Sequence, residues 1–88
     1  MEEDLAIVVD EGVPAGRALS IIQSFPLVRS VAVFDVYTGP PVVEGKKSLA
    51  FSISFQAPDH TLTDAEVSRQ RRGIMERLRR ELGAELRA

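Results

Sequence analysis

Residues 48–56 alternate apolar and small side chains almost perfectly. Successive side chains of a β-strand point to opposite faces, so this period of two predicts a strand with one buried face. The chain must therefore build a sheet that packs its apolar side against other elements. The two sets of alternating residues are Leu49, Phe51, Ile53 and Phe55 on one side, and Ser48, Ala50, Ser52 and Ser54 on the other.

The segments before this strand also carry local signals. Residues 5–9 are a short β-branched run that predicts a buried strand, and residues 28–37 alternate well enough for another strand. Between them, Pro14 suits the first turn of a helix, which must end before Pro26 because the residue preceding proline avoids helical geometry. Residues 38–45 hold two prolines and two glycines and predict a loop.

A second helix is predicted after the alternating strand. Residues 63–66 match the S/T-x-x-E capping box that opens many helices, and Gly83 is a natural end. Gly73 weakens this helix by up to ~1 kcal/mol relative to alanine. Residues 84–87 are expected to add a short final strand. The apolar stripe of the helix consists of Val67, Ile74, Met75, Leu78 and Leu82.

The resulting order, β-α-β-β-α-β, predicts an α+β fold of the ferredoxin-like type. Its antiparallel sheet would carry both helices on one face and leave the other face open. We expect the covered face to hold Leu5, Ile7, Val9, Ala32, Phe34, Val36, Leu49, Phe51, Ile53 and Phe55. The open face would hold Ala6, Val8, Val33, Asp35, Tyr37, Lys46, Ser48, Ala50 and Ser52.

Length and composition exclude several classes of protein. With 88 residues the chain is expected to form a single domain, residues 1–88, with one core. It has no cysteine and only one histidine, His60, so neither a disulfide framework nor a zinc site is expected. No apolar run approaches the ~20 residues that span a bilayer, and the acidic start does not fit a signal peptide. We expect a cytoplasmic protein without a membrane partner.

The charge is distributed unevenly. The net charge is −2, but residues 1–44 carry a net −5 and residues 45–88 a net +3. Six arginines fall within residues 69–80, which suggests an RNA-binding stripe. The simpler interpretation is a solvated helix face on which Glu76 is spaced to pair with Arg72 and Arg80, and Arg77 with Glu81. Any contact with nucleic acid should therefore be local.

Polar groups gather at one end of the predicted open face. Strand alternation places Asp35, Tyr37, Lys46 and Ser48 there together. Such a face can hold one unstacked RNA base, with a ring for stacking, hydrogen-bonding groups for the base edge and a cation for its phosphate. The same residues are also compatible with an ordinary edge tyrosine, a carboxylate that caps the following loop, and solvated lysines.

Five segments in order resemble the ferredoxin-fold anticodon-binding domain found at the C-terminus of the bacterial phenylalanyl-tRNA synthetase β-subunit. They are residues 4–10 (DLAIVVD), 34–39 (FDVYTG), 44–51 (EGKKSLAF), 61–64 (TLTD) and 83–87 (GAELR). The chain departs from the family pattern at Glu3, where a basic residue is usual. It also departs at Arg71 and Gly73, where the family's second helix tends to be apolar or to favour helix more strongly.

The resemblance implies a module that grips the anticodon stem-loop of phenylalanine tRNA. In the family the wobble guanine is held by these strands, which implies Tyr37 as its stacking partner and Asp35 and Ser48 as base-edge contacts. Lys46 is the expected phosphate contact. The family's catalytic motifs are absent, so we expect no catalytic residue and no cofactor in this domain, with ATP and Mg belonging to the catalytic core of the parent enzyme. The other partners implied are the remaining domains and the α-subunit of the synthetase.

The residues can be compared with the requirements of two other functions. Ferredoxin-like sheets often serve as protein-docking or small-molecule regulatory domains, although the predicted open face offers polar groups rather than a large apolar patch. An acylphosphatase-like hydrolase would need an Arg/Asn constellation and a glycine-rich anion loop, and the sequence shows neither.

Overall fold

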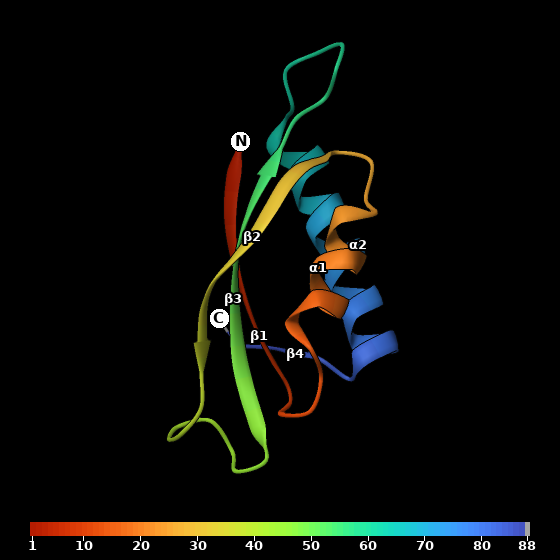
Figure 1. The fold of residues 1–88 in the computed structure, drawn as a ribbon. Coiled ribbons are helices and arrows are strands. Elements are labelled where there is room, and N and C mark those ends of the chain that lie inside the picture. The colour runs from red at the N-terminus through yellow and green to blue at the C-terminus, as the bar shows by residue number, and fades with distance from the viewer. Residues whose placement is uncertain (88) are drawn as a thin grey trace.

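The computed structural model describes residues 1–87 and contains a four-stranded antiparallel sheet with two helices. Strands β1 (Glu2–Asp10), β2 (Val28–Tyr37), β3 (Lys46–Phe55) and β4 (Glu85–Leu86) lie in the order β2-β3-β1-β4. Helices α1 (Ala15–Gln23) and α2 (Asp64–Leu82) cover the same face of this sheet (Figure 1). The predicted α+β ferredoxin-like fold is confirmed. Neither described helix is long and apolar enough to cross a membrane.

Helix α2 begins and ends where its local sequence predicts. The Thr63 hydroxyl accepts the Glu66 amide N–H at 3.2 Å, and the Glu66 carboxylate accepts the Thr63 amide N–H at 3.1 Å, which completes the capping box. Gly83 ends the helix with φ +65°, a conformation that favours glycine. All five residues of the predicted apolar stripe are buried. Gly73 has a packing role, because a Cβ there would lie 3.1 Å from the ring of Phe25.

The core lies between the helices and the covered face of the sheet. Alternate residues of β1 and β3 are almost completely buried, and the apolar faces of α1 and α2 pack against them. Each such large side chain contributes about 1.5–3 kcal/mol when it is fully removed from water. The largest fully buried side chains are Phe51, Phe55, Ile7, Ile22, Leu49, Ile53, Ile74, Leu78 and Val9.

The edge strand β2 differs from the predicted alternation. Its pairing with β3 shifts between Val28 and Ser30 and again between Val33 and Asp35, so Arg29 and Phe34 are extra residues. Each extra residue of a β-bulge reverses which alternate side chains face the core. Three of the predicted placements on β2, those of Ala32, Val33 and Phe34, are affected and are corrected below.

Val33 lies opposite the buried Phe51 and packs against the core, whereas Ala32 lies opposite Ser52 on the open face. The predicted faces of Val33 and Ala32 were therefore wrong. Phe34 was expected on the covered face but is 60% exposed. Val36 does lie opposite the buried Leu49, yet it is 56% exposed, and this end of the sheet extends beyond the helices (Figure 1).

Candidate nucleic-acid interface

The residues predicted to hold a base do lie on the open face. In the β2–β3 pairing, Asp35 lies opposite Ala50 and Tyr37 opposite Ser48. In the β1–β3 pairing, Lys46 lies opposite Asp10. Because residues directly opposite one another in an antiparallel pair share a face, these residues occupy the face that the helices leave free. The structure thus brings Asp35, Tyr37, Lys46 and Ser48 to the same end of the open face.

The loop after β2 holds Tyr37 in place. The phenolic hydroxyl donates a hydrogen bond to the Pro40 carbonyl at 2.5 Å, so the loop folds back against its own strand. Gly39, at φ +105°, makes this return possible in a conformation that other residues rarely adopt. The Tyr37 residue remains 38% exposed, so part of it is open to solvent.

Arg87 is a member of this site that sequence reasoning missed. Its guanidinium carbon lies 5.6 Å from the centroid of the Tyr37 ring, within the range of a cation–π interaction. Its backbone N–H donates to the Ala6 carbonyl at 2.9 Å, which fixes the chain beside β1. Because β3 and β1 lie between β2 and β4, the side chains of Tyr37 and Arg87 meet above the intervening strands. The sequence signal for this contact was the predicted final strand, because that strand would bring Arg87 to the edge of the sheet.

Ser48 differs from the other predicted contacts in its accessibility. The residue is only 3% exposed, whereas Asp35 is exposed and the Lys46 side chain is 41% exposed. Ser48 lies between Val8 and Tyr37 in the sheet. Its burial leaves little of the hydroxyl open to a base in this structure.

Lys46 is engaged within the domain. Its ammonium nitrogen lies 2.6 Å from a carboxylate oxygen of Asp10, and this hydrogen bond raises the pKa of Lys46. A phosphate that approaches Lys46 must therefore compete with the Asp10 carboxylate. The assignment of Lys46 as a phosphate contact stays a prediction.

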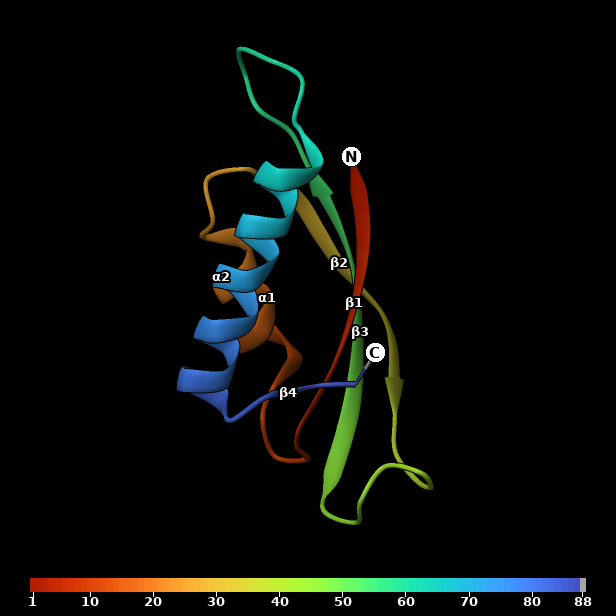
Figure 2. The ribbon, with the colours of Figure 1, turned by 180° about the vertical axis from the view of Figure 1, so that it is seen from behind.

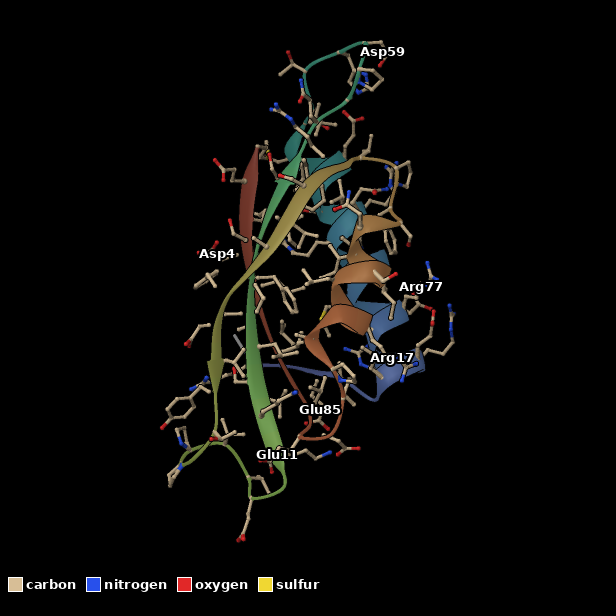
Figure 3. All side chains as sticks on the ribbon, viewed as in Figure 1. Asp4, Glu11, Arg17, Asp59, Arg77 and Glu85 are labelled. Carbon is tan, nitrogen blue, oxygen red and sulfur yellow. The ribbon has the colours of Figure 1, made fainter. Side chains whose placement is uncertain are left out.

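The arginines of α2 lie on the helical side of the molecule. Figure 3 shows Arg77 projecting from the helical layer, with Asp4 on the side of the open face. The predicted ion pair between Arg77 and Glu81 is present. Among residues 1–87, however, Glu76 forms no ion pair with Arg72 or Arg80. Within the same range, no cluster of three or more acidic or histidine side chains could hold a metal ion.

A comparison with protein families adds to this geometry. The model of the ferredoxin-fold anticodon binding domain matches residues 1–87. The chain belongs to this family. As a ferredoxin-fold anticodon-binding domain, it presents the family's open sheet face with Tyr37 and Asp35 side by side in alternate positions of β2.

Individual relatives support the assignment. The chain is 48% identical over 89 residues to the phenylalanine–tRNA ligase beta subunit of Moorella thermoacetica, which covers 99% of this chain and 11% of that protein. It is 46% identical over 84 residues to the same subunit of Anaeromyxobacter dehalogenans, covering 96% of this chain and 10% of that protein. The chain therefore spans about a tenth of the length of these relatives.

Proposed function

We propose that this domain binds the anticodon stem-loop of phenylalanine tRNA as part of a phenylalanine–tRNA ligase beta subunit. The names of its relatives and the match to an anticodon-binding family support this function. In this proposal the domain itself performs no chemistry, and ATP and Mg act in the catalytic core of the whole enzyme. The α-subunit and the other domains of the synthetase are the remaining partners.

We further propose that Asp35 and Tyr37 read the wobble guanine. The observation that supports this most directly is their shared face, since both lie opposite open-face residues of β3. Guanine alone presents adjacent N1–H and N2–H donors on its Watson–Crick edge, and one ionised carboxylate can accept both. Adenine or a pyrimidine would leave the oxygens of Asp35 without these partners.

The other residues of the site have supporting roles. Tyr37 offers a π-face for the base, and such stacking contributes ~1–3 kcal/mol per base. Arg87 supplies positive charge close to the Tyr37 ring, and Lys46, which is paired with Asp10, is a second cation at the same end of the open face. Ser48 joins the base edge only when its hydroxyl becomes more exposed than it is in this structure.

The experiment is a titration of the domain with a hairpin RNA that carries the phenylalanine anticodon loop, and with hairpins in which the wobble guanine is replaced by each other base. Tyr37→Ala should weaken binding of the guanine hairpin by about 1–3 kcal/mol. Asp35→Ala should abolish the preference for guanine.

Asp4→Ala is the matched control for Asp35→Ala. It removes the same charge from the same face, away from the proposed base site, and should preserve the preference for guanine. If the wild-type domain does not distinguish the four hairpins, the assignment of the wobble guanine is wrong. If the Asp35→Ala variant loses affinity for all four hairpins by the same factor, Asp35 has a structural role only.

A further inference from the structure

Among residues 1–87, no strand lies beside the first half of β1, and this place is called the vacant position below. It pairs with β3 from Glu2 to Asp10, but with β4 only at Ile7 and Val8. The Arg87 N–H then donates to the Ala6 carbonyl, which is the last backbone contact with β1 among residues 1–87. The first half of β1 forms the free edge of the sheet in Figure 2.

The backbone groups along this edge are free. In an antiparallel ladder, alternate residues direct both their N–H and C=O groups to the same neighbour. Asp4 and Glu2 therefore direct their groups the same way as Ala6, toward the vacant position. In the described part of the chain, no backbone hydrogen bond reaches them from that side. Such an edge is a template for another strand.

A groove of about 540 Å³ lies directly beside this vacant position, between α2 and the β1–β4 edge. Its apolar floor is formed by Leu5, Met75 and Leu86. Leu86 is 54% exposed, which is unusual for a leucine in a sheet strand that borders the core. A side chain that entered the groove from a strand paired with β1 would bury this apolar surface.

Arginines form the outer wall of the groove. Arg71, Arg72 and Arg79 line it, with Glu76 as the one lining carboxylate among the described residues. Arg71 is paired with Glu3, whereas Arg72 and Arg79 have no ion-pair partner within residues 1–87. The groove therefore attracts negative charge.

We propose that this edge and groove bind an extended polypeptide segment that adds a strand to β1. Its side chains toward α2 would be acidic and apolar, opposite Arg72, Arg79 and the floor. Its outward side chains would be basic or neutral, because Glu2 and Asp4 stand on the open-face side of the vacant position. A polypeptide fits better than RNA, since only a peptide backbone repeats donors and acceptors at the spacing of a strand. The same two carboxylates repel phosphate.

The segment comes from another part of the synthetase to which the domain belongs. This source rests on the proposed function and on relatives about ten times as long as the chain. Peptide binding is measured separately from RNA binding, so either proposal can fail alone.

The test uses the ¹⁵N-labelled domain and two capped peptides, TEKLTET and TKELTKT. As a strand, the first directs Glu, Leu and Glu to one face, and the second directs Lys, Leu and Lys there. We expect TEKLTET to shift the amide resonances of residues 2–5 and of the α2 residues that line the groove, with saturation. TKELTKT should bind at least tenfold more weakly.

Variants make the test specific to the edge and the groove. Asp4→Pro removes an edge N–H that β3 does not use, and should abolish binding. Asp4→Ala keeps this N–H and loses only an exposed carboxylate, so it should weaken binding by no more than about twofold. Arg72→Ala and Arg79→Ala should each weaken binding roughly two- to fivefold. Arg80→Ala removes the same charge from α2 outside the groove and should have no effect.

Several results would overturn the proposal. Equal binding of the two peptides, shifts confined to other surfaces, or the absence of saturable shifts would each do so. So would a hairpin RNA that shifts the groove residues, because RNA would then be the occupant. Concentration-dependent self-association that Asp4→Pro abolishes would show that the occupant is a second copy of the domain.

Discussion

At the scale of single residues, two departures from the family pattern turn out to be partners. Arg71 on α2 donates to the carboxylate of Glu3 on β1, although the two are far apart in sequence. The carboxylate and the guanidinium compensate for each other in charge. The side chains are 29% and 44% exposed, so solvent screens the pair.

We predict that the two positions are energetically coupled. Glu3→Arg should lower the free energy of unfolding by about 0.5–1 kcal/mol, because it places two cations together. The exchanged variant, Glu3→Arg with Arg71→Glu, should recover most of this loss. Urea unfolding of the wild type, both single variants and the double variant gives the coupling energy. Simple additivity of the two single changes would show that the contact contributes nothing.

His60 makes a second prediction at this scale. Its ring nitrogens lie 2.7 Å from a Glu66 oxygen and 2.8 Å from an Asp59 oxygen. These hydrogen bonds, chiefly that with Glu66, raise the pKa of His60 above its usual 6.5. The hydrogen bond to His60 is also the main cause that lowers the pKa of Glu66 below its usual 4.5.

The contribution of His60 is complete below its unfolded pKa and disappears as the pH rises through the raised folded value. The contribution of Glu66 is complete above its unfolded pKa and disappears as the pH falls through the lowered folded value. The wild-type domain should therefore be more stable than the His60→Gln variant, and the difference in stability should be largest between about pH 4.5 and 6.5. Melting temperatures of both proteins across pH 3–9 test this, and parallel curves would contradict it.

At the scale of elements, the sequence predicted correctly those features of the helices that local residues determine. The capping box, the apolar stripe of α2 and Gly83 each depend on contacts within a few residues, and each was predicted correctly. The faces of β2 depend instead on its pairing with β3. The adjacent apolar residues Val33 and Phe34 mark a change of phase, but only the register with Phe51 and Ala50 shows which of them faces the core.

The same limit applies to the site. Asp35 and Tyr37 were placed correctly because both follow the second bulge and keep one phase up to the loop. The position of Arg87 over Tyr37, and the burial of Ser48, depend on how side chains of different strands pack on the finished sheet. No pattern within a single strand contains that information.

The bulge predicts an asymmetric response to deletions in β2. Deleting Phe34 removes the extra residue, so Asp35 should stay opposite Ala50 and Tyr37 opposite Ser48. We expect a folded domain that keeps its preference for guanine. Deleting Val36, which is similarly exposed, should instead bring Tyr37 opposite Leu49 and turn it away from the open face. Amide spectra and hairpin titrations of both deletions test this; equal losses would mean that the bulge itself shapes the site.

At the scale of the whole molecule, most of the arginines lie on the side of the sheet opposite the proposed base site. The open face carries the proposed base site with Arg87 and Lys46, whereas most arginines of the chain lie on α2. The net charge is −2, so general attraction to a polyanion is weak. In the proposed function, binding of RNA therefore depends on a few contacts at the base site, and the isolated domain lacks the gain in effective concentration that tethering within an enzyme provides.

This separation predicts a shallow salt dependence. Each phosphate neutralised in a single-stranded nucleic acid contributes a slope of about −0.7 to a plot of log K against log salt concentration. If Arg87 and the predicted phosphate contact Lys46 each neutralise one phosphate, the slope for the anticodon hairpin is about −1.4, and Arg87→Gln should reduce it to about −0.7. Arg72→Gln, on the helical side, should leave the slope unchanged. A slope of about −3 or steeper would mean that RNA also contacts the arginines of α2, which would place the RNA across the edge of the sheet rather than on its open face alone.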